Sequence, residues 1–137
     1  MLIFNDALFR HFSKGKTGFL KYLQEALSKS TLVIYTGKRY PSDKPVTDRK
    51  YKFVVMPLQG GFKIVDNKIV MGKVQSAIAR HNGELTWFRI YIDKDTWMTG
   101  DVGKKSTCCI QIIDPFVVKD SYFYLHTLTI DFNMYFM

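Results

Sequence analysis

Short runs of β-forming residues, in which two sets of side chains alternate, constrain the fold of this chain most. The run ELTWFRIYI at 84–92 places Phe88, Ile90 and Ile92 at one set of alternate positions and Trp87, Arg89 and Tyr91 at the other. Successive side chains of a strand point to opposite faces of a sheet. The run therefore predicts a strand, at 85–92, with two chemically different faces. Further strands are predicted at 31–36, 51–56 and 122–132, with two short runs around the turn pair Asp66–Asn67.

The run at 122–132 alternates along its whole length and predicts one long strand. The face expected to be apolar carries Tyr122, Tyr124, His126, Leu128, Ile130 and Phe132. Leu128 and Ile130 are expected to pack in one core with Phe88 and Ile90. On such a face, His126 is interpreted as a structural histidine rather than a catalytic one.

The first 30 residues predict a helical arm. Phe19, Leu20, Leu23 and Leu27 recur at helical spacing within 17–29, with Thr17 as the N-cap. A further helical turn is expected near Leu8, capped by Asn5 or Asp6. Glycines at 15 and 18 are expected to let the arm move, so that its first residues reach a partner. A truncation of residues 1–12 is then expected to leave a folded domain.

Length and composition fit one domain that spans residues 1–137. The chain has 137 residues, 47% of them hydrophobic, and an aromatic content of 15% that favours strands. The predicted class is mainly β: an antiparallel β-sandwich of jelly-roll or immunoglobulin-like type at 31–137, preceded by a short N-terminal helical segment at 1–30. The order of the strands stays open.

The segment 37–52, GKRYPSDKPVTDRKYK, which we call the basic loop, is the most cationic stretch. Residues 1–82 carry a net charge of +10 and residues 83–137 carry −2, which sum to the formal +8 of the chain. Such asymmetry indicates an acidic partner, either nucleic acid or an anionic protein surface, or else only a solvated lysine-rich surface. Either the two tyrosines of the loop stack on bases, or they pack at the rim of the core. The candidate interaction residues are Lys38, Arg39, Tyr40, Arg49, Lys50, Tyr51 and Trp97.

Patterns that would carry catalysis or hold a metal are weak. SKGKTG at 13–18 resembles the end of a phosphate-binding loop, but Arg10 stands where the first glycine is needed. Cys108 and Cys109 are adjacent, which suits neither a disulfide nor a zinc site. The pair Asp93 and Asp95 is interpreted as a solvated turn. The sequence thus predicts a non-enzyme without cofactor or metal. Its N-terminus is not expected to act as a signal peptide, and the sequence contains no run of 18 apolar residues.

Three segments, taken in order, resemble a family of small β-rich virion proteins of tailed bacteriophages. They are LVIYTGKRYPSDKPVTDRKYKFVVM at 32–56, GELTWFRIYIDKDTWMTGDVGKKS at 83–106 and HTLTIDF at 126–132. In that family a "LRIYTG" segment precedes a proline-containing loop, and a "TWFRIY" strand leads to a "DGxVG"-like segment, here TGDVG at 99–103. This chain differs by its many lysines and aromatic residues.

The resemblance implies a structural virion protein, most simply a head decoration or auxiliary capsid protein that binds and stabilises the assembled capsid. Its partners would be the major capsid protein or other virion subunits, and it would be multimeric in a particle assembled in the host cytoplasm. The basic loop would face acidic capsid surface. A neck or tail component is the alternative within the virion. A β-barrel module that binds single-stranded nucleic acid is the alternative from another class.

Overall fold

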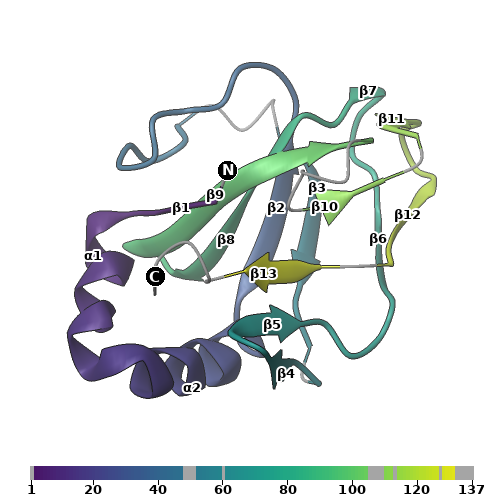
Figure 1. The fold of residues 1–137 in the computed structure, drawn as a ribbon. Coiled ribbons are helices and arrows are strands. Elements are labelled where there is room, and N and C mark those ends of the chain that lie inside the picture. Colours follow the sequence, from purple (N-terminus) through teal and green to yellow (C-terminus); the bar gives the residue numbers. More distant parts are fainter. Residues whose placement is uncertain are drawn as a thin grey trace.

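The computed structural model describes residues 2–47, 52–59, 61–104, 110–112, 114–126 and 128–131. Short N-terminal helices precede antiparallel β-sheets (Figure 1), which confirms a mainly β class with a helical start. The main sheet has the order β1 (Ile3–Phe4), β9 (Thr96–Gly103), β8 (Trp87–Asp93), β2 (Thr31–Tyr35) and β3 (Lys52–Pro57), and β10 (Ile110–Gln111) pairs in parallel with β9. The strands predicted at 31–36, 51–56 and 85–92 are thereby confirmed.

Three small sheets make up the rest of the described β structure. They are β13 (Thr129–Asp131) with β5 (Lys68–Val70) and β4 (Lys63–Val65), β12 (Tyr122–Leu125) with β6 (Gln75–Ile78), and β11 (Phe116–Val117) with β7 (Gly83–Glu84). Asp66 and Asn67 join β4 to β5 with φ of 50° and 64°, the left-handed turn of a two-residue hairpin, as predicted. The described strands form no closed barrel.

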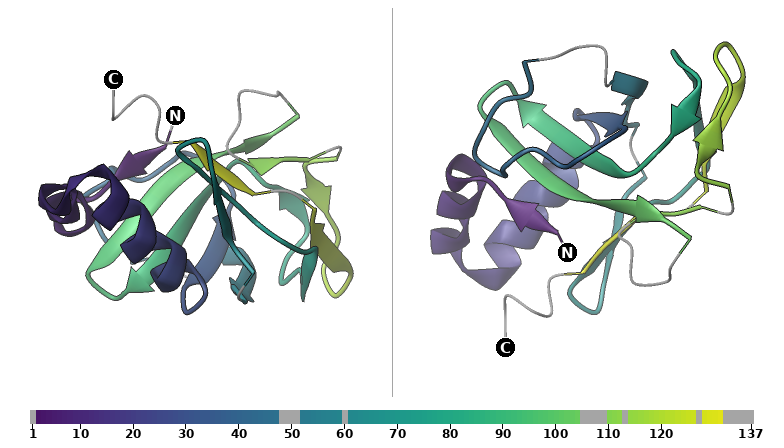
Figure 2. Two further views of the ribbon diagram at one scale, coloured as in Figure 1. Left: turned by 60° about the horizontal axis from the view of Figure 1, so that its bottom comes forward. Right: turned by 90° about the horizontal axis from the view of Figure 1, so that it is seen from above.

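The main sheet has two faces, as the alternation at 85–92 predicted. On the front face Leu32, Ile34, Phe88 and Ile90 are buried, in one core with Leu128 and Ile130, as expected. On the back face Val33, Tyr35 and Trp87 form a second cluster. Figure 2 (right) shows β13 and the basic loop on opposite sides of the sheet.

The predicted long strand at 122–132 is wrong, because β12 and β13 are separate strands that pair with β6 and β5. Odd-numbered positions are buried before the break between the two strands, and even-numbered positions are buried after it. Phe123 and Leu125 are buried in β12, whereas Tyr122, Tyr124 and His126 are exposed, the reverse of the expectation. Beyond the break Leu128 and Ile130 are buried as expected. Phe132 lies outside the described residues.

The helices begin and end earlier than predicted. They are α1 (Asp6–Phe9), the 3-10 helix η1 (Arg10–Lys14) and α2 (Gly15–Leu27), so Thr17 lies inside α2 and is not its N-cap. Phe19, Leu20, Leu23 and Leu27 are buried as expected. Asn5 caps α1, since its side chain accepts a hydrogen bond from the Leu8 N–H. In the part of the chain that is described, no helix has the length and apolar character needed to cross a membrane.

The expectation of a free N-terminal arm is also wrong. Strand β1 pairs with β9, with Ile3 opposite Thr99, and Leu2, Phe4 and Leu8 are buried in the core. Asn5 is 5% exposed, and its side chain donates to Asp95 O (2.8 Å) and accepts from the Trp97 N–H (3.2 Å). The first residues therefore belong to the fold.

Gly72 lies so close to the backbone at Gly61 that a larger residue does not fit. A Cβ atom on Gly72 would stand 2.1 Å from the Gly61 carbonyl oxygen. We expect Gly72→Ala to lower the free energy of unfolding by about 1–3 kcal/mol, because backbone has to move. Urea unfolding measures the loss, and Lys73→Ala, at the exposed neighbouring residue, is the control. Equal stability of the two variants would show that the segment accommodates the methyl group freely.

Candidate interaction surfaces

Residues 37–47 of the basic loop are folded over the back face of the main sheet. Lys38 is exposed, and Arg39 forms an ion pair with Asp101. Tyr40 stacks on Trp87 at a centroid distance of 5.9 Å. This contact matches the interpretation in which a loop tyrosine packs at the rim of the core. Arg49, Lys50 and Tyr51 lie outside the described residues.

Arg89, on the back face of the sheet, anchors the loop through hydrogen bonds to its backbone. Its side chain is fully buried, and Cζ lies 5.5 Å from the ring centroid of Trp87 and 4.9 Å from that of Trp97. Its guanidinium donates to Thr99 Oγ1 (3.0 Å), Lys44 O (2.7 Å) and Pro41 O (3.2 Å). A buried cation needs such hydrogen bonds because it has lost its water. Burial lowers the pKa of Arg89 from its ordinary value.

The two tryptophans of the back face make their contacts within the chain. Trp97 is 5% exposed, and its indole N–H donates to Ser42 O (2.6 Å). Trp87 stacks on Tyr35 at 4.2 Å and donates to Thr36 O (3.3 Å). Burial and a hydrogen bond to Tyr91 (2.8 Å) raise the pKa of Tyr35. Trp97, a candidate interaction residue, thus lies under the loop.

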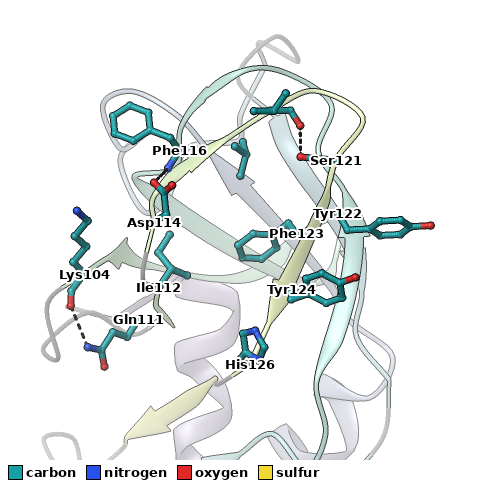
Figure 3. A pocket seen from close by; sticks show the side chains of 12 residues that line it. Lys104, Gln111, Ile112, Asp114, Phe116, Ser121, Tyr122, Phe123, Tyr124 and His126 are labelled. Carbon is teal, nitrogen blue, oxygen red and sulfur yellow. Dashed lines mark hydrogen bonds between the residues drawn. The ribbon is translucent and has the colours of Figure 1, made fainter.

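A second surface, absent from the sequence prediction, surrounds a hollow of about 640 Å³ beside β12 (Figure 3). Its lining comes from β10, β11 and β12 and the segments next to them: Lys104, Gln111, Ile112, Asp114, Phe116, Val117, Val118, Ser121, Tyr122, Phe123, Tyr124 and His126. Ser121 Oγ donates to Val118 O (2.5 Å), and the Phe116 N–H donates to Asp114 Oδ1 (3.0 Å). These bonds shape the turn that carries the apolar residues.

The outer face of β12 presents a row of rings, which we call the aromatic ladder: Tyr122, Tyr124 and His126. Tyr122 and Tyr124 stack at 6.1 Å, and Tyr124 lies 6.2 Å from His126. The two tyrosines are 64% and 52% exposed, although each offers a large apolar surface. In Figure 3, Tyr122 points away from the hollow.

Together with the ladder, neighbouring exposed apolar side chains form an apolar patch around the hollow. Ile78, the cross-strand partner of Tyr122, is 50% exposed, and Phe116 and Val118 at the rim are also exposed. Soluble monomers seldom leave such patches uncovered, and large ones often mark binding sites. The sequence signal for this patch was the apolar run FVV at 116–118, between Pro115 and Asp120, where a solvated loop would be polar.

The histidines do not converge. The ring of His11 stacks on that of Tyr22 with 4.0 Å between the centroids, and the ring centroid of His81 lies 5.3 Å from that of Phe53. His126 belongs to the ladder. Across the described residues, no three His, Cys, Asp or Glu side chains gather as a metal site requires. Asp93 and Asp95 occupy the exposed β8–β9 turn, as predicted. Cys108 and Cys109 lie outside the described residues.

No family model, curated protein or solved structure matches the chain.

Proposed function

We propose that the protein is a structural component of a tailed-phage virion, an auxiliary or decoration protein that binds and stabilises the assembled capsid. The particle setting comes from the resemblance of the segments at 32–56, 83–106 and 126–132. The observation that carries the binding role is the exposed aromatic ladder beside the β12 hollow. The protein acts by binding and has no catalytic task.

The ladder is suited to hold another subunit of the particle. Tyrosine supplies a large contact area with little side-chain entropy to lose, and it is enriched among residues that dominate interface energies. A protein that binds only the assembled lattice stabilises that lattice by mass action. Many copies on one particle add their modest affinities.

We also propose that the small sheets form the second layer of a β-sandwich. Ile69 of β5, Leu125 of β12 and Ile130 of β13 share one core with the front face of the main sheet. Such a layer would give β12 a rigid support, so that its exposed rings lose little freedom when a partner binds.

Replacing the two tyrosines of the ladder tests the role. We expect the double variant Tyr122→Ser, Tyr124→Ser to lose attachment to particles, at a cost of about 2 kcal/mol for each ring. Co-sedimentation with particles that lack the protein measures attachment. The double variant Ile64→Ser, Val65→Ser on β4 is the control, because it also removes two exposed apolar side chains. Full attachment of the tyrosine variant would refute the assigned surface.

Copy number separates the alternatives within the virion. Quantitative mass spectrometry of purified particles should find many copies for a capsid protein and few for a neck or tail component. Binding of single-stranded nucleic acid would instead need open rings on the basic loop, and Tyr40 is stacked on Trp87. Tight binding of oligothymidylate at physiological salt, with no protein in particles, would favour that alternative.

A further inference from the structure

The back face of the main sheet carries a second hollow, of about 570 Å³, next to the part of the sheet that the basic loop covers. Its floor is apolar and largely aliphatic, formed by Val33 of β2, Val55 of β3 and Val46 of the loop, with Tyr91 and Trp97 at one side. We call it the basic hollow because of the residues at its rim.

Among the described residues, four cations and one carboxylate stand around this floor. Lys29 follows α2, Lys52 begins β3, Arg80 follows β6, and Lys94 lies in the β8–β9 turn beside Asp93. These residues are far apart in the sequence, so the fold itself brings them together. Within the described part of the chain, Lys29, Arg80 and Lys94 form no ion pair. Like charges gathered around a low-dielectric floor attract an anion and orient it.

The side chains on the floor of the basic hollow favour an acidic peptide over a nucleic acid as the bound anion. Stacking of nucleic-acid bases needs open aromatic rings. Here Trp97 lies against Arg89 and is almost fully buried, and the Tyr91 hydroxyl is hydrogen-bonded to Tyr35. The aliphatic floor instead suits an apolar side chain, and the surrounding cations suit carboxylates on both sides of it.

We propose that the basic hollow binds an acidic peptide segment of a partner protein, with one apolar side chain of that segment seated on Val33, Val46 and Val55. The inference rests on the proposed function and names the chemistry of one partner. Together with the aromatic ladder it gives the molecule two different binding surfaces, one basic and one aromatic. Such a molecule can bridge two subunits.

The test uses the full chain and a labelled synthetic peptide in which glutamates flank one phenylalanine. Fluorescence anisotropy should show binding that weakens as salt is raised, because exposed charges are screened. Reversing the rim charges with Lys29→Glu, Arg80→Glu and Lys94→Glu should weaken binding by about tenfold or more. Lys21→Glu, Lys63→Glu and Lys73→Glu change the net charge equally at exposed sites away from the hollow and should bind almost as wild type does.

A second peptide, with serine in place of the phenylalanine, tests the apolar floor without altering the protein and should bind more weakly. Absence of peptide binding, equal loss in both triple variants, or tighter binding of oligothymidylate than of the peptide would overturn the proposal. If the peptide does not bind but the protein still attaches to particles through Tyr122 and Tyr124, the proposed peptide site is wrong and the proposed virion role is unaffected. Peptide binding by a protein that never enters particles would refute the virion role alone.

Discussion

Deletion of residues 1–9 is expected to leave the chain unfolded. The deletion removes β1 and α1, and with them Leu2, Phe4 and Leu8 from the core. Each large buried side chain is worth about 2–5 kcal/mol, and a domain is usually stable by about 5–15 kcal/mol. The far-ultraviolet circular dichroism of the truncated chain should therefore lose its β signal, and its amide resonances should collapse into a narrow range.

Two point variants locate the origin of this effect. Leu8 is fully buried and Phe9, the next residue, is 54% exposed. We expect Leu8→Ala to lower the free energy of unfolding by about 2–5 kcal/mol and Phe9→Ala to lower it much less. A folded truncated protein, or equal losses in the two variants, would restore the interpretation of a detachable arm.

Replacement of Arg89 by Met is expected to cost about 3–5 kcal/mol of stability and to release the basic loop from the sheet. The change leaves the carbonyl oxygen of Lys44 without its donor and removes the cation between the two tryptophan rings. It also removes one hydrogen bond to the carbonyl oxygen of Pro41, which keeps the Lys44 N–H as its other donor. An unsatisfied buried polar group costs about 1–3 kcal/mol, and a desolvated cation–π contact is worth about 2 kcal/mol. Urea unfolding measures the loss, and trypsin cleavage after Lys38 should become faster.

Arg39→Met is the matched control. Arg39 also carries a guanidinium and pairs with Asp101, but the two side chains are 28% and 36% exposed. Partly exposed ion pairs contribute less than about 1 kcal/mol. Similar losses in the two variants would mean that the buried contacts of Arg89 do not hold the loop.

The sequence predicted the strands best where its two alternating sets differed in chemistry. In β8, Phe88 and Ile90 alternate with Arg89, so the sequence showed directly which side chains share a face of the sheet. In β12, Phe123 and Leu125 alternate with Tyr122 and Tyr124, so both sets contain apolar rings and the alternation alone could not choose a face. The break before β13 then depends on strand partners that local sequence does not encode.

The two surfaces proposed to bind partners could not be predicted from the sequence, for a related reason. The rim of the basic hollow joins Lys29, Arg80 and Lys94, which stand in three separate connections between elements. Pairing of Ile3 with Thr99 likewise links two segments that are far apart in the sequence and share no local pattern. The basic loop was recognisable by its composition. Its path over the sheet could not be predicted, because it depends on the buried Arg89, which is 45 residues from Lys44 in the sequence.

The way in which Arg89 and Trp97 hold the loop bears on how this protein can change over generations. They bind the carbonyl oxygens of Pro41, Ser42 and Lys44, and every amino acid has such an oxygen. The path of the loop is thus largely independent of which side chains stand at 42 and 44. Substitutions there alter the exposed surface of the loop while the loop keeps its shape, so this surface can diverge between related proteins without a new fold.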